Sequence, residues 1–388
     1  MTRKYKRASV ALAGIALACT SAAGTAELPL LDGRAQSIEL IEAMVKEAMS
    51  SRDVPGLGVA LIHEGRVTFA KTYGDRSLQP KLPLQVETVM YGASLTKATF
   101  AWFVMQLVDE KKITLDRPIA EYLAKPLPEY PRYRDLAGDA RWKQLTFRML
   151  LNHTTGFANF RWIEPDKKLR FHRDPGTRYG YSGEGIMLAQ FVVEAGLKLD
   201  VGQEMQRRIF DRFGMTRTSM TWRHDFAKNF AQGYNEEGGL VPHDQRESVS
   251  AAGSMDTSLH DWSRFLAVVA RGEGLSRESK AEMIRLQIEI DSERQFPTIT
   301  EARTEKWRSI RLGYGLGWGV FETPYGHAFF KEGHDDGTAN YALCIEEKRA
   351  CILLLSNSTR AEAIFVSLVH RLLGEVPIPA EWEGYGPG

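Results

Sequence analysis

A serine and a lysine three residues apart, Ser94 and Lys97, are the pair in this chain most suited to chemistry. They form the single Ser-x-x-Lys sequence in 388 residues, and an apolar run typical of a buried helix follows directly. Side chains three residues apart share a helix face, so the amine can reach the hydroxyl. A lysine whose pKa is lowered by burial and nearby positive charge can take the serine proton and make the oxygen a nucleophile. The alternative is a helix that begins with serine and carries a surface lysine.

Further motifs occur downstream in a fixed order. Pro175-Gly-Thr-Arg-Tyr-Gly-Tyr181-Ser-Gly183 forms a turn and an aromatic pair ahead of a second apolar helix, and Gly333-His-Asp-Asp-Gly337 lies between two strand-like segments. This order and spacing resemble the serine β-lactamase and penicillin-binding superfamily, nearest to its branch of class C β-lactamases, D,D-peptidases and family VIII esterases. The resemblance runs from about residue 36 to about 373, and it is also carried by Leu150–Gly156, Ala251–Thr257 and Gly313–Trp318.

The resemblance implies an acyl-enzyme mechanism with three catalytic residues. Ser94 attacks a carbonyl and Lys97 accepts or shares its proton. Tyr181 matches the tyrosine of the family's Tyr-x-Asn element. Between Lys97 and another cation, its phenol would either ionise more easily or shuttle the proton between Ser94 and the leaving group. The alternative for Tyr181 is a role in packing only.

The chain departs from the family pattern around the substrate. Gly183 stands where Asn usually holds the substrate amide, which removes two hydrogen-bonding atoms. For the family's Lys-Thr-Gly or His-x-Gly element, we count back from Tyr341 and place His334-Asp335-Asp336 there. His334 would then supply the polar or positive contact near Tyr181 and a substrate carboxylate. Asp336 would narrow the groove beside the substrate, and its charge would disfavour an anionic carboxylate. The N–H groups of Ser94 and Gly337 would form the oxyanion hole. The alternative is a polar hairpin turn over residues 333–338.

Other polar and aromatic residues are assigned structural roles. His153 resembles the family's buried loop motif, and Asp256 and Thr257 are expected to cap a helix that starts near Leu259. Phe160 and Trp162 either line the mouth of the cleft or pack inside the protein. We find no Gly-x-Ser-x-Gly, His-Glu-x-x-His or Cys-x-x-Cys motif, so a nucleophile elbow and a metal site are unsupported, and no cofactor is expected.

The sequence therefore predicts a serine hydrolase of this superfamily, with a small molecule or a peptide as its substrate. Three substrate classes stay open: β-lactams, D-amino-acid peptides and small esters. Gly183 and Asp336 favour an esterase or a specialised peptidase. The alternatives are a carboxylesterase of the same fold and a non-catalytic sensor that recognises penicillins or wall fragments. With 50 Lys and Arg against 49 Asp and Glu, and no long basic block, nucleic acid is a poor partner.

The first 26 residues are typical of a signal peptide. A basic start, Thr2–Arg7, precedes an apolar stretch, Val10–Ala18, which is too short to span a bilayer comfortably. The protein is thus expected to be exported, periplasmic or secreted, with no transmembrane span after cleavage and with Cys19 as a candidate lipid anchor. In an oxidising compartment, Cys344 and Cys351, opposite each other in a predicted hairpin, form either a disulfide or two buried thiols.

The pattern of elements predicts an α+β fold of the β-lactamase/transpeptidase-like kind. Residues 27–92 and 301–388 are expected to share an antiparallel sheet flanked by helices, and this lobe is discontinuous in sequence. Residues 93–300 form a mainly helical lobe. We expect the active site in the cleft between the two lobes.

Overall fold

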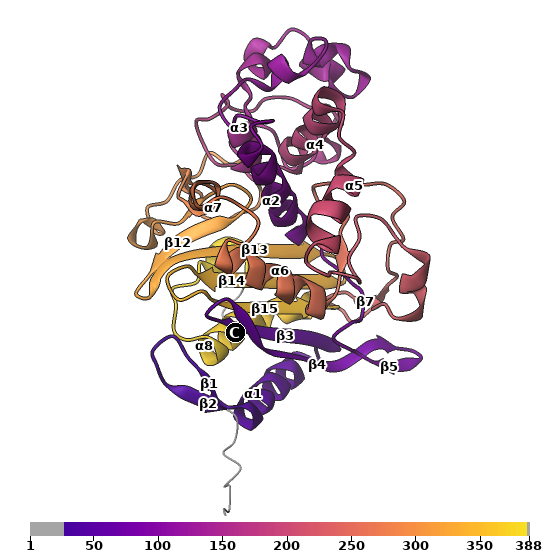
Figure 1. The fold of residues 1–388 in the computed structure, drawn as a ribbon, viewed down its shortest axis with the longest axis vertical. Helices are drawn as coiled ribbons and strands as arrows, with labels where there is room; N and C mark the ends of the chain where they lie inside the picture. The colour runs from indigo at the N-terminus through magenta and orange to yellow at the C-terminus, as the bar shows by residue number, and fades with distance from the viewer. Residues whose placement is uncertain (1–26, 386–388) are drawn as a thin grey trace, which may run out of the picture.

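The computed structural model describes residues 27–385, and its central feature is an antiparallel sheet of nine strands (Figure 1). The N- and C-terminal parts of the chain share this sheet, because β3 pairs with β15. The strands are, in spatial order, β10 Ile288–Glu289, β11 Gly313–Tyr314, β12 Gly319–Thr323, β13 Gly326–Asp335, β14 Thr338–Ile345, β15 Ala350–Ser356, β3 Gly56–His63, β4 Arg66–Leu78 and β5 Lys81–Pro83.

The sheet separates two hydrophobic cores, because alternate residues of a strand point to opposite faces. In β3, Leu57, Val59 and Leu61 belong to the core that contains α1 (Ile38–Ser51) and α8 (Glu362–Leu372). Ala60 and Ile62 belong to the other core, with α6 (Leu259–Arg271) and α2 (Leu95–Asp109). Helix α2 is buried on all sides, so this core holds it rigidly against the sheet.

The second lobe is mainly helical and lies above the sheet in Figure 1, where α3 and α4 are labelled. Its helices include α3 (Phe147–Leu151), α4 (Gly183–Leu197) and α5 (Val201–Met205). The other α-helices and strands are α7 Arg277–Ile284, α9 Ala380–Glu383, β1 Glu27–Pro29, β2 Ala35–Ser37, β6 Met90–Tyr91, β7 Gly233–Tyr234, β8 Leu240–Val241 and β9 Asp256–Thr257.

The predicted α+β fold is confirmed, with two local differences. Strand β10 joins the sheet from within residues 93–300, the segment predicted to be mainly helical. Helix α6 begins at Leu259, as predicted, but its cap is Ser258, whose side chain accepts the Asp261 N–H. The prediction that Asp256 and Thr257 cap this helix is wrong, because both residues form β9 and pair with β6.

Of the two predicted states of Cys344 and Cys351, the structure contains the disulfide, and the two residues face each other across β14 and β15. The predicted signal peptide and Cys19 lie outside the described residues. Between residues 27 and 385, no helix has the length and apolar character needed to cross a membrane.

Candidate active site

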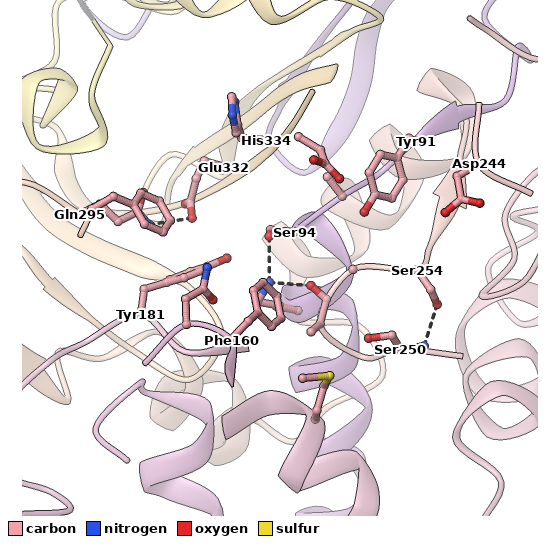
Figure 2. A pocket seen from close by; sticks show the side chains of 18 of the residues that line it. Tyr91, Ser94, Phe160, Tyr181, Asp244, Ser250, Ser254, Gln295, Glu332 and His334 are labelled. Carbon is pink, nitrogen blue, oxygen red and sulfur yellow. Dashed lines mark hydrogen bonds between the residues drawn. The ribbon is translucent and has the colours of Figure 1, made fainter. Parts of the chain in front are cut away.

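The Ser94 hydroxyl is presented at the start of α2, at the boundary between the lobes. Ala93, just before it, has φ +45°, which is unusual for a residue other than glycine and turns the chain sharply into the helix. The Lys97 Nζ lies 2.8 Å from the Ser94 Oγ, as expected for residues one helical turn apart. Figure 2 shows this contact at the centre of the cavity. The predicted serine–lysine pair is therefore present in hydrogen-bonding geometry.

Lys97 is enclosed and lacks a carboxylate partner within residues 27–385. Its side chain is 1% exposed, and its amine also donates to the Ala252 carbonyl at 2.5 Å. Burial holds the pKa of Lys97 well below its ordinary value, and the charge of Lys331 lowers it further, while Glu332 and Asp335 oppose the shift. Such an amine is neutral at lower pH than an exposed lysine, as a base for Ser94 must be.

Tyr181 lies between two lysines. The Nζ atoms of Lys97 and Lys331 are 5.0 Å and 5.1 Å from its ring centroid, and the Lys331 Nζ is 3.4 Å from its hydroxyl. Burial and the Glu332 charge nevertheless raise the pKa of Tyr181 well above its ordinary value, against the effect of its contact with Ser94. This direction disfavours the alternative in which the phenol ionises easily. A protonated Tyr181 fits the second alternative, a proton shuttle.

Lys331 is not among the site residues predicted from the sequence, although it is the second cation beside Tyr181. It is fully buried in β13 and donates to the Glu332 carboxylate at 2.6 Å. Lys331-Glu332-Gly333 fits the Lys-Thr-Gly pattern with glutamate in the middle, so the element begins three residues before the predicted His334. The available signal was the Lys-x-Gly spacing itself, together with a lysine inside an apolar strand.

His334 lies at the edge of the cavity rather than beside Tyr181 (Figure 2). Its side chain is about half exposed and pairs with the Glu362 carboxylate, which raises the pKa of His334. The prediction that His334 binds near Tyr181 is therefore wrong, because Lys331 occupies that place and the imidazole points to another partner.

Asp336 and Gly337 form the two-residue turn that joins β13 to β14, with Asp335 opposite Thr338. Gly337 has φ +73°, which suits glycine, and its N–H donates to the Thr359 hydroxyl at 3.0 Å. Neither turn residue lines the cavity that contains Ser94. The predicted oxyanion-hole role of Gly337 and the predicted groove contact of Asp336 are therefore wrong.

An aromatic wall replaces the side chain that Gly183 lacks. A Cβ on Gly183 would lie 2.2 Å from the Phe160 ring, so this ring occupies the place of a larger residue. Phe160 stacks on Trp162 with 3.9 Å between ring centroids, and both line the cavity. The Gly183 N–H donates to the Asn159 side chain at 2.9 Å. Gly183 has no side chain with which to contact a substrate, and its effect is to leave space for the Phe160 ring.

The predicted structural role of His153 agrees with its surroundings. Its ring packs 4.4 Å from that of Tyr181, its Nδ1 accepts the Ser182 N–H, and it is fully buried. Burial lowers the pKa of His153 well below the ordinary value, so the ring is neutral. It supports Tyr181 from behind and has no contact with Ser94.

Ser94, Lys97 and Tyr181 line a cavity of about 930 Å³ between the lobes. One wall is the segment from Asp244 to Ser254, another is the Phe160–Trp162 stack, and a third is β13 with the C-terminal helix α9. Within residues 27–385, no cluster of three or more His, Cys, Asp or Glu side chains is arranged to hold a metal ion.

The fold and site agree with comparisons to known proteins. The Beta-lactamase family model matches residues 41–372, so the chain belongs to this family, within the serine β-lactamase and penicillin-binding superfamily. The chain is 22% identical over 314 residues to a beta-lactamase of Escherichia coli (strain K12), covering 78% of this chain and 75% of that protein. The relatives of this family include hydrolases, among them "Unguisins hydrolase ungD" of Aspergillus violaceofuscus (strain CBS 115571), 25% identical over 262 residues, covering 61% of this chain and 45% of that protein.

The chain spans about half the length of the first curated relatives it matches, the unguisins hydrolases and a fimbrial assembly protein. Among solved structures, an octameric penicillin-binding protein homologue from Pyrococcus abyssi has a TM-score of 0.68 at 21% identity, covering 90% of this chain and 79% of that one. D-alanine carboxypeptidase AmpC from Burkholderia cenocepacia has a TM-score of 0.65 at 19% identity, covering 88% and 95%. These two likenesses establish the fold.

Proposed function

We propose that this protein is a serine hydrolase that forms an acyl-enzyme on Ser94. The observation that carries the proposal is the 2.8 Å contact between Ser94 and a buried Lys97 that no carboxylate neutralises within residues 27–385. The neutral Lys97 amine takes the Ser94 proton as the oxygen attacks the substrate carbonyl. The Tyr181 hydroxyl, next to Lys331, then passes its proton to the leaving group and regains one from the protonated Lys97, and water releases the acyl group by the reverse route.

Two backbone N–H groups are suited to hold the oxyanion. One belongs to Ser94, at the positive end of α2. The other is assigned to His334. Hydrogen-bonding pairs alternate along an antiparallel hairpin, so the closing pair Asp335–Thr338 bonds across the strands and His334 directs its N–H away from β14. The pairing of β12 with β13 ends at Phe330, so β13 has no neighbouring strand on that side at His334.

The cavity favours substrates without a carboxylate, which places esters and neutral amides ahead of β-lactams and acidic D-peptides. Glu332 occupies the middle of the Lys-x-Gly element and lines the cavity, and its carboxylate already pairs with the Lys331 ammonium that a substrate carboxylate would need. Phe160 fills the place of the amide-binding Asn. Both features support an esterase-type hydrolase of small or peptide substrates. We also propose export, since the Cys344–Cys351 disulfide is typical of oxidising compartments.

The test is the intact mass and turnover of the purified protein with p-nitrophenyl butyrate and, separately, with benzylpenicillin. We expect ester hydrolysis with a transient butyryl adduct, little reaction with penicillin, and neither reaction in Ser94→Ala. Ser94-dependent hydrolysis of penicillin would instead assign β-lactams as the substrate class. Absence of Ser94-dependent chemistry with both compounds would contradict the proposal and favour a non-catalytic sensor.

The pH dependence of ester hydrolysis is a further prediction. The active form of Lys97 is the neutral amine, so kcat/KM should rise with pH as Lys97 loses its proton. Because burial and Lys331 lower the pKa of Lys97, the plateau should be reached well below pH 10.5, the ordinary lysine value. Initial rates across pH 5 to 9.5 measure this. An ascending limb centred at the ordinary lysine value would contradict the assignment of Lys97 as base.

A further inference from the structure

Two buried carboxylates line the cavity near Lys331, and the charge of one acts on the other. Glu332 comes from β13 and is 6% exposed, and Glu383 comes from α9, at the other end of the C-terminal region, and is 9% exposed. Both line the cavity that contains Ser94. Figure 2 shows Glu332 joined to Gln295 at this wall.

These carboxylates have more acceptor oxygens than donors. The Glu332 Oε1 accepts from Lys331 at 2.6 Å and from Gln295 at 2.9 Å. The Glu332 Oε2 and both Glu383 oxygens are buried with no hydrogen-bond donor among residues 27–385. The Tyr341 hydroxyl is near Glu383 but outside hydrogen-bonding geometry. Buried acceptors without donors are costly, so these three oxygens suit a ligand that brings several N–H donors.

The charges around the cavity also favour a ligand with N–H donors and a positive charge. Five carboxylates line it, and the basic side chains that line it are Lys97, Arg246 and His334. His334 is paired with Glu362, and Arg246 lies over the Tyr91 ring at 3.8 Å on the opposite wall. The Lys331 charge offsets one of the two buried carboxylates. Burial and the Glu332 charge raise the pKa of Glu383 well above its ordinary value, a shift that a cation bound beside the two carboxylates would oppose.

We propose that Glu332 and Glu383 form a subsite for a protonated amine of the substrate, so that the hydrolase acts on esters or amides that carry an ammonium group. The catalytic part rests on the proposed function, whereas the cation site does not. An ammonium has three N–H donors and no acceptor, which matches three free carboxylate oxygens. Phe296, half exposed and in contact with Tyr181, adds an aromatic edge to the cavity against which an alkylammonium can pack.

The experiment uses three inhibitors of one shape and different charge: benzylammonium, benzyl alcohol and benzoate. Each competes with p-nitrophenyl butyrate in the wild-type protein. We expect the inhibition constant of benzylammonium to be at least about tenfold below that of benzyl alcohol, with benzoate weakest. Equal inhibition by all three, or tighter inhibition by benzoate, would overturn the cation site.

Matched glutamate variants locate the effect. Glu383→Gln should reduce the preference for benzylammonium over benzyl alcohol to about threefold or less, and the ratio cancels any general loss of activity. Glu381→Gln, on the same helix but with its side chain 67% exposed and paired with Lys306, should keep the wild-type ratio. An unchanged ratio in Glu383→Gln would overturn the role of Glu383. If this variant does not fold, the charge series on the wild type decides.

Calorimetric binding of the same three compounds to Ser94→Ala separates this inference from the proposed function, because binding needs no turnover. Selective binding of benzylammonium without ester hydrolysis in the wild type would support the cation site and contradict the hydrolase. Ester hydrolysis without charge selectivity would support the hydrolase and overturn the cation site.

Discussion

Replacement of Lys97 by methionine is expected to lower kcat/KM for p-nitrophenyl butyrate by about 10³-fold. A general base commonly contributes 10²- to 10⁴-fold, and among the described residues the Lys97 amine is the group that hydrogen-bonds the Ser94 hydroxyl. Methionine is similar in length and apolar, so it suits the buried environment. Stopped-flow measurement of p-nitrophenolate release under single-turnover conditions isolates acylation, the step that needs the base.

The matched control is Lys46→Met, which removes a lysine whose side chain is 65% exposed on α1, on the far face of the sheet. It should hydrolyse the ester like the wild type. Circular dichroism and thermal unfolding establish whether Lys97→Met retains the fold, since this substitution leaves the Ala252 carbonyl without its donor. A folded Lys97→Met protein with wild-type acylation would contradict the role of the base.

The parts that were predictable from sequence depend on local spacing. Ser94 and Lys97 are one helical turn apart, so a helix at this position is enough to bring them together. Cys344 and Cys351 flank a short turn, and the hairpin register alone sets them opposite each other. Alternating apolar residues likewise predict the strands. In each case the period of the secondary structure carries the information.

The rest depends on where turns fall and on contacts between distant segments. Counting back from Tyr341 puts the third element three residues late, because Asp336 and Gly337 are themselves the turn between β13 and β14. Phe160 fills the space beside Gly183 from a loop 23 residues upstream. Glu383 lines the same cavity as Glu332 from a helix 51 residues downstream. No periodicity links such pairs, so only the packed fold brings them together.

The arrangement of Tyr181 separates its role from that of Lys97. Both side chains adjoin Ser94, but their pKa values shift in opposite directions: that of Lys97 is lowered and that of Tyr181 is raised. The shift of Lys97 favours an amine that can accept a proton, and that of Tyr181 favours a phenol that keeps one. Lys97 therefore matches the start of the reaction, when Ser94 loses its proton. Tyr181 matches the later step, when the leaving group gains one.

Substitution Tyr181→Phe is expected to lower kcat/KM, which reports acylation, by about 10²-fold for an alkyl ester such as ethyl butyrate. The hydroxyl that adjoins Ser94 and Lys331 is lost, while the ring keeps its contacts with His153 and Phe296. Loss of one hydroxyl should change the free energy of unfolding by only about 1 kcal/mol. Tyr179→Phe is the matched control, because the Tyr179 hydroxyl is buried without a hydrogen-bond partner among residues 27–385.

The choice of leaving group makes the test of Tyr181 specific. p-Nitrophenolate is stable as an anion and needs no proton to depart, whereas an alkoxide does. The loss of kcat/KM in Tyr181→Phe should therefore be several-fold smaller for p-nitrophenyl butyrate than for ethyl butyrate. Lys97→Met should lose activity toward both esters, because its step precedes departure. Equal losses for the two esters in Tyr181→Phe, or a comparable loss in Tyr179→Phe, would show that the tyrosine supports the site by packing and does not transfer the proton.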